Sequence, residues 1–126
     1  MIRDVIFIAL GGALGALSRH GMAAFVNEQL GHRYASGTLI VNLLGSFAIG
    51  ILYVLITEKL VIHPDWRQVL IIGFLGAFTT FSTFSLDAVL LWENGSAGLA
   101  LLYVIGSVVC CVFAAGAAIT LTRFVV

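Results

Sequence analysis

Four long apolar segments divide this chain and leave room only for short polar connections between them. We predict them at residues 5–26, 38–57, 68–92 and 97–122. A helix of about 20 apolar residues rises roughly 30 Å, which is the thickness of the hydrocarbon core of a bilayer. Only 10% of the 126 residues are charged, against roughly 25% in a soluble domain. The sequence therefore predicts an all-α membrane protein of four transmembrane helices that form a single transmembrane domain, residues 1–126.

The charges are few and balanced. Six basic and six acidic residues give a formal net charge of zero, so no basic stripe is available to bind phosphates and we expect no nucleic-acid partner. The start of the chain looks superficially like a signal peptide, but Arg19 and further apolar residues continue it, and we expect a retained first span.

Lysine and arginine in short loops set the orientation of a membrane protein. One predicted side holds Arg3, Lys59, Arg67 and Arg123; the other holds Arg33, and Arg19 if its side chain reaches that interface. This bias is weak. It is compatible with both termini inside, and also with a chain that inserts in both orientations.

Polar side chains inside the spans mark either helix packing or a permeation path, because lipid offers them no hydrogen bonds. Asn42 lies one helical turn after Thr38 and on the same face. Its amide offers two donors without a charge, which suits an anion. The alternative is an amide that joins two helices.

The third segment is the most unusual. Residues 79–85 carry five hydroxyls in seven positions, and Gly73 and Gly76 precede them. Hydroxyls that bond to nearby carbonyls, together with weakly helical glycines, favour a broken helix here. Phe78, Phe81 and Phe84 recur at three-residue spacing. Such a stripe is also typical of core packing.

Other intramembrane residues permit simpler interpretations. Asp87 is the only acid well inside a span; its cost in lipid favours a hydrated vestibule near one mouth. Arg19 is expected to anchor its helix at an interface, because a guanidinium can extend to water. Cys110 and Cys111 are adjacent in an apolar stretch, which is typical of buried thiols rather than of a disulfide framework or a metal site.

No enzyme chemistry is indicated. No Ser-His-Asp or Cys-His set is spaced so that one residue could activate another, and the three histidines form no ligand-like cluster. A small anion gives up a hydration energy of tens of kcal/mol in a low dielectric and needs many donors in succession. Hydroxyls and amides are such donors, and the positive edge of a phenyl ring is a weaker one. A cation would need oxygen ligands, which an exposed backbone in the third span could also supply.

Three motifs stand out along the chain. They are GGALGA at residues 11–16 followed by Arg19; GTL at 37–39 with Val41, Asn42 and Gly45; and GFLG at 73–76 with TTFSTFS at 79–85. Together they resemble one known family, the Fluc/CrcB fluoride channels, and the likeness extends over all four spans.

This resemblance implies a passive, fluoride-selective channel that exports cytoplasmic fluoride across the bacterial inner membrane. It also implies an antiparallel, dual-topology homodimer in the lipid bilayer. The implied pore residues are Asn42, Phe81, Phe84, Thr83, Tyr103 and Ser107, with Asp87 in the vestibule. The implied cofactor is a structural sodium ion at the dimer interface, held by the backbone carbonyls of Gly76 and Thr79.

Two positions depart from what we expect of the family. Asp87 stands where some relatives have glutamate, and Cys111 stands where a second serine of the last span can occur. Two other functions remain open. A small dual-topology multidrug exporter has the same size but needs a membrane-embedded acid, which the first span lacks. A non-transporting assembly subunit would use the small-residue faces alone.

Overall fold

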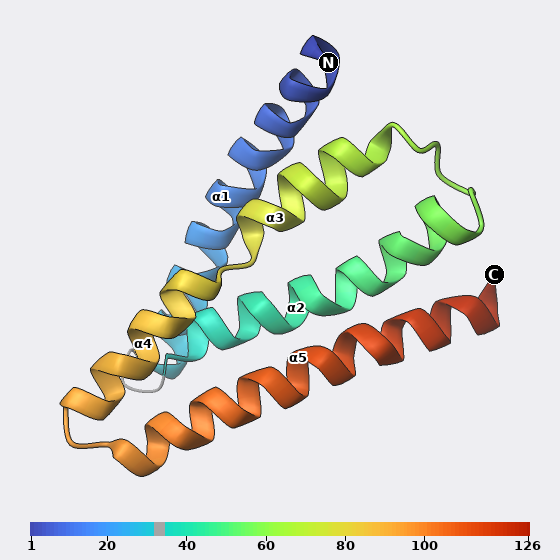
Figure 1. The fold of residues 1–126 in the computed structure, drawn as a ribbon. Helices are drawn as coiled ribbons and strands as arrows, with labels where there is room; N and C mark the ends of the chain where they lie inside the picture. Colours follow the sequence, from blue (N-terminus) through green and yellow to red (C-terminus); the bar gives the residue numbers. More distant parts are fainter. Residues whose placement is uncertain (32–34) are drawn as a thin grey trace.

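The computed structural model describes residues 1–31 and 35–126, which contain helices and no strands. In chain order the elements are α1 (Ile2–Leu30), α2 (Ser36–Tyr53), the π-helix η2 (Val54–Glu58), the π-helix η3 (Arg67–Leu75), α3 (Gly76–Phe78), α4 (Phe81–Glu93) and α5 (Ala97–Val125) (Figure 1). They form four stretches long and apolar enough to cross a membrane: α1, α2 with η2, η3 through α4, and α5. The predicted all-α class with four spans is confirmed, and the chain is a multi-pass membrane protein.

The first helix is longer than we predicted. We expected its span to end near residue 26, but α1 continues to Leu30, and Gly31 follows it with a φ of 84°. The polar residues Asn27, Glu28 and Gln29 are compatible with a helix that projects beyond the hydrocarbon core, because the helical backbone satisfies its own hydrogen bonds there. Arg33, which entered our charge count, lies outside the described residues.

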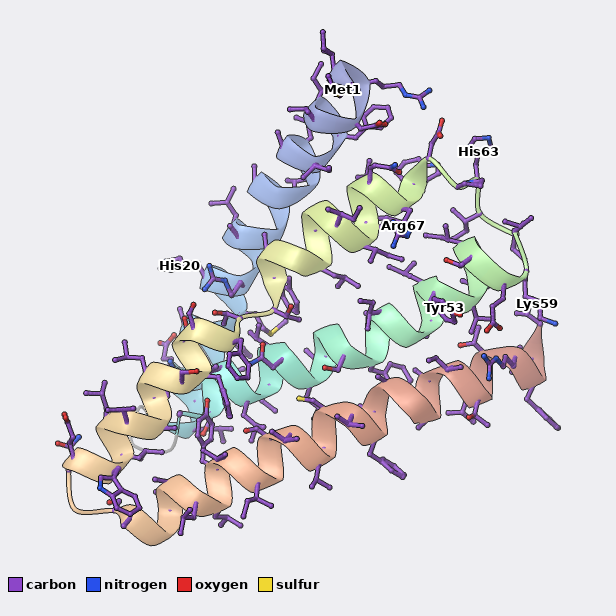
Figure 2. All side chains as sticks on the ribbon, in the orientation of Figure 1. Met1, His20, Tyr53, Lys59, His63 and Arg67 are labelled. Atoms are coloured by element: carbon purple, nitrogen blue, oxygen red, sulfur yellow. The ribbon has the colours of Figure 1, made fainter. Side chains whose placement is uncertain are left out.

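Two ion pairs bring the termini and the 59–66 connection to the same end of the bundle. An Nη of Arg3 donates to Oδ1 of Asp65 at 3.3 Å. Arg123 makes a bidentate pair with Glu58, in which its Nε donates to Oε2 at 2.9 Å. Figure 2 shows Met1, Lys59 and His63 toward this end. Arg3 and Arg123, which we assigned to one side, are thus both paired with residues next to or within the connection that holds Lys59 and precedes Arg67.

Glycines let α1 pack closely against η3. A methyl group at Gly15 would overlap the carbonyl oxygen of Phe74, and one at Gly11 would overlap that of Val69. From the other side, a methyl group at Gly73 would lie 2.8 Å from the carbonyl oxygen of Ile8. Because no hydrophobic effect drives helices together within lipid, such backbone-to-backbone packing carries much of their association.

The second major contact joins α2 to α5, and a glycine again lets the two backbones approach closely. A methyl group at Gly50 would lie 2.6 Å from the carbonyl oxygen of Ala115. Val41, Leu75 and Phe78 form a small buried cluster between α2 and the third span. Our expectation of two buried thiols is wrong for Cys110, which is exposed in the single chain, while Cys111 is half-buried. An apolar helix face in a membrane can meet lipid as readily as protein, so apolarity alone does not predict burial there.

Gly15→Ala should loosen the contact between α1 and η3. The new methyl group must displace the Phe74 carbonyl, and overpacking of this kind costs roughly 1–3 kcal/mol. We expect a lower free energy of unfolding in detergent micelles. Gly21→Ala is the matched control, since a methyl group at that position would have nothing within 4 Å; it should be neutral or slightly stabilising through helix propensity. Equal effects of the two changes would contradict this account of the interface.

Candidate functional site

The third span is interrupted at two consecutive threonines. Helix α3 ends at Phe78, Thr79 has a ψ of 156°, and Thr80 has a φ of −152° and a ψ of 117°. Helix α4 then starts at Phe81, and Oγ1 of Thr80 caps it by accepting a hydrogen bond from the backbone N–H of Thr83 at 3.3 Å. These extended residues lie inside the stretch whose glycines and hydroxyls led us to expect a broken helix.

Asn42 holds the interruption from α2. Its Nδ2 donates to the carbonyl oxygen of Thr80 at 3.0 Å, and its Oδ1 accepts from the N–H of Thr80 at 2.8 Å. The amide oxygen thus replaces the acceptor that the Thr80 N–H would have in a continuous helix. The amide N–H adds a second bond to the Thr80 carbonyl, which as the N-cap carbonyl also accepts the first bond of α4. This is the alternative that we left open, an amide that joins two helices. One N–H of the amide is not used in these two bonds, so a role as an anion donor stays a prediction.

A groove of about 400 Å³ runs beside the interruption. Most of its wall is apolar, and its polar groups are uncharged. It is lined by Asn42, Gly45, Ser46, Ile49, Ile71, Leu75, Gly76, Thr79, Thr80, Phe81, Phe84, Ser107, Val108, Cys111 and Val112. Of the residues that we predicted for the pore and the sodium site, this groove brings together Asn42, Phe81, Phe84 and Ser107 with Gly76 and Thr79.

The two phenylalanines differ greatly in exposure. Phe84 is 7% exposed and Phe81 is 76% exposed, although their ring centroids are only 5.3 Å apart. Phe84 also lies 5.3 Å from the ring of Tyr103. The three rings therefore form a row from the interior of the chain to its surface, and Phe81 is at the outer end.

Ser107 presents a polar group that no protein atom satisfies. It is 5% exposed, and its Oγ has no hydrogen-bond partner among the described residues. Cys111 follows one turn later in α5 and also lines the groove. A buried hydroxyl without a partner costs about 1–3 kcal/mol, so its position in the wall of a groove is consistent with a transient ligand.

Thr83 does not line this groove. It lies instead at a second, more polar pocket of about 370 Å³, together with Arg19, His20, Asn27, Thr38, Val41, Thr80 and small residues of α1. Thr80 is shared by both pockets, and its Oγ1 lies 3.2 Å from that of Thr83. The three threonines of the motif at residues 79–85 are therefore divided between two cavities, and its two serines line neither, which the sequence pattern did not indicate.

Asp87 and Tyr103 form a separate contact between α4 and α5. The hydroxyl of Tyr103 donates to Oδ2 of Asp87 at 3.4 Å, which is a long hydrogen bond. Tyr103 is buried, but neither residue lines the groove. Their assignments to pore and vestibule stay predictions.

Arg19 has a partner within the protein. Its Nε donates to the carbonyl oxygen of Ala77 at 3.0 Å, directly before the interruption. It lies about 16 Å of helix before Leu30, the last residue of α1, and its role as an interfacial anchor stays a prediction. The arginine within the first motif was visible in the sequence, but its partner was not.

Comparison with known proteins identifies close relatives. The family model described as CrcB-like protein, Camphor Resistance (CrcB), matches residues 6–119. The fluoride-specific ion channel FluC of Hahella chejuensis is 47% identical, over 98% of this chain and 98% of its own. That of Saccharophagus degradans is 50% identical, over 92% of this chain and 86% of its own. That of Magnetococcus marinus is 44% identical, over 97% and 99%.

Asn42→Ala should free the backbone of Thr80. The Thr80 N–H would lose its acceptor at membrane depth, at a cost of about 1–3 kcal/mol, and the Thr80 carbonyl would lose one of its two donors. We expect faster hydrogen exchange of the Thr80 amide and a lower free energy of unfolding. Ser46→Ala, one turn later in the same groove, is the control. If the Thr80 amide exchanges equally fast in both variants, Asn42 does not hold the interruption.

Proposed function

This chain belongs to the CrcB-like family, and on that premise we propose that it is a fluoride-selective channel that lets cytoplasmic fluoride leave the cell passively across the inner membrane. Three relatives of 44% to 50% identity that extend over nearly the whole chain bear the name fluoride-specific ion channel. A passive channel needs no catalytic residues, so the protein is a transporter of ions and not an enzyme.

The observation that carries this proposal is the chemistry of the groove. Its polar side chains are one amide, several hydroxyls and a thiol beside two phenyl rings, without a charged side chain. Successive neutral donors can replace the water that an anion sheds and still release it, because no fixed charge holds it. Ser107 has a buried hydroxyl without a protein partner and Asn42 has an unused N–H, so both are ready donors.

We assign the rings and the remaining residues as follows. Phe81 and Phe84 present the positive edges of their rings to the ion. Asn42 and Ser107 donate within the groove. Thr83 acts from the neighbouring pocket, and Tyr103 supports the ring of Phe84. Asp87 belongs to the vestibule, where its bond to Tyr103 keeps it from the groove itself.

The working unit is a homodimer of two antiparallel chains, inserted in opposite orientations, each with its third span broken. The exposure of Phe81 and the open groove support a second chain, because lipid cannot satisfy the polar groups there. Four basic residues on one predicted side against Arg33 and Arg19 on the other leave only a weak orientation bias, as two opposite insertions require.

The backbone around the interruption fits a structural sodium ion. In a continuous helix, the Gly76 carbonyl would accept from the N–H of Thr80, and the Thr79 carbonyl from that of Thr83. The first N–H donates instead to Oδ1 of Asn42, and the second to Oγ1 of Thr80. Both carbonyl oxygens, at a groove wall, are therefore available as the hard oxygen ligands that such cations prefer. Two chains would supply four, and the ion would join them at the dimer interface.

The purified protein in liposomes should release fluoride rapidly and chloride negligibly. Phe81→Ile or Phe84→Ile should abolish fluoride efflux, because an aliphatic side chain has no positive edge, while the dimer persists in size-exclusion chromatography. Leu86→Ile, an exposed apolar position of the same helix, is the control and should conduct normally. Equal fluoride and chloride rates would refute selectivity. Proton-driven uptake of organic cations would instead indicate an exporter.

Sodium should stabilise the dimer. A ligand that binds only the folded state adds RT ln(1 + [L]/Kd), which is about 2.7 kcal/mol at a hundredfold excess over Kd. We expect a lower Tm and slower fluoride efflux when N-methylglucamine replaces sodium on both sides of the membrane, with recovery on its return. Identical Tm values in the two solutions would remove sodium from the proposal without affecting the fluoride assignment.

A further inference from the structure

Arg19 donates a hydrogen bond to a backbone carbonyl of the third span that has lost its helical donor. It is half-buried in α1, and its Nε lies 3.0 Å from the carbonyl oxygen of Ala77. In a continuous helix this oxygen would accept from the N–H of Phe81. Because Thr79 and Thr80 are extended, Phe81 instead opens α4. An oxygen left without a donor at membrane depth costs several kcal/mol.

The charge of Arg19 is also matched to this position. The other five basic residues lie in connections or near helix ends, so Arg19 is the one basic residue well inside a predicted span. Over residues 1–31 and 35–126, no carboxylate lies within ion-pair distance of it. The carbonyl end of a helix carries a partial negative charge that favours a cation. The end of α3 therefore serves as the counter-group of this guanidinium.

Arg19 and Asn42 hold the two sides of the interruption from two different helices. Arg19 binds Ala77 before Thr79, and Asn42 binds Thr80 after it. Thr79 lies between these contacts, so the direction of its carbonyl, and of the Gly76 carbonyl one turn earlier, depends on both.

We propose that Arg19 is a positioning residue for the interruption of the third span, acting through its hydrogen bond to the Ala77 carbonyl rather than as an interfacial anchor or as an attractor of anions. This inference rests on the proposed channel function, in that the segment it positions is the one that lines the groove. The three roles differ in what they require of the side chain: a donor, an amphipathic stem, or a positive charge.

Arg19→Gln and Arg19→Met form a matched pair, since both are uncharged and unbranched and only the glutamine has an N–H donor. Arg19→Lys keeps the charge and a donor. Ser18→Ala, at the exposed neighbouring position, is the control. Fluoride efflux from liposomes should stay within about threefold of the wild type for the glutamine and lysine variants, and fall roughly tenfold or more for methionine, the usual effect of losing a hydrogen bond to a charged group.

A second readout detects the contact itself. Carbonyl-¹³C alanine with ¹⁵N phenylalanine labels only two Ala-Phe pairs in this chain, at residues 24–25 and 77–78. In solid-state NMR of the protein in lipid, the Ala77 carbonyl signal should move upfield in the methionine variant and stay near its wild-type position in the glutamine variant. The Ala24 signal is the internal reference and should not move.

The outcomes are distinct. Slow flux in both neutral variants with normal flux in the lysine variant would show that charge alone matters, and would overturn the proposal. Normal flux in every variant, or an Ala77 signal that does not move in the methionine variant, would also overturn it. If the methionine variant does not assemble, the glutamine and lysine variants decide by the same criteria. A wild-type protein that conducts no fluoride would refute the channel function, while the Ala77 signal would still test the contact.

Discussion

The structure depends on one constraint, which is that a main chain inside a membrane must find its hydrogen-bond partners within the protein or in a cavity that it lines, because lipid offers none. Three spans meet it with helical bonds. The third does not, because Thr79 and Thr80 are extended. Side chains take up several of the released groups: Asn42 binds the N–H and the carbonyl of Thr80, and Arg19 binds the Ala77 carbonyl. The irregular segment can persist only because two other helices bring polar side chains to it.

Close helix packing makes those contacts possible. Gly11 and Gly15 let α1 lie against the backbone of η3, so the start of the third span is held before Arg19 reaches the interruption. A methyl group at Gly45 of α2 would meet the side chain of Thr79, one turn from Asn42. The glycines thus set the distance, and the polar side chains then fix the conformation.

Much of this could be predicted from the sequence. Hydropathy predicted the four spans, and composition singled out Asn42 and the hydroxyl-rich stretch, because polar residues are costly in lipid. The partners could not be predicted, since a hydrogen bond between Asn42 and Thr80 depends on how two helices cross. The sequence also could not show that α1 continues to Leu30, beyond the predicted span, or that Arg19 binds the Ala77 carbonyl. Thr83 and Ser107 line different pockets. This could not be predicted either, because the interruption at residues 79 and 80 changes the direction in which the side chains of α4 point.

The two hydrogen bonds between Asn42 and the main chain of Thr80 also limit which substitutions this sequence can accept. Asn42 binds the backbone of residue 80 and not its side chain. A replacement of Thr80 would therefore remove the side-chain cap of α4, but both hydrogen bonds from Asn42 could still form. A replacement of Asn42 has no such reserve, because few side chains offer a donor and an acceptor at that spacing. We therefore expect position 80 to tolerate more substitutions than position 42.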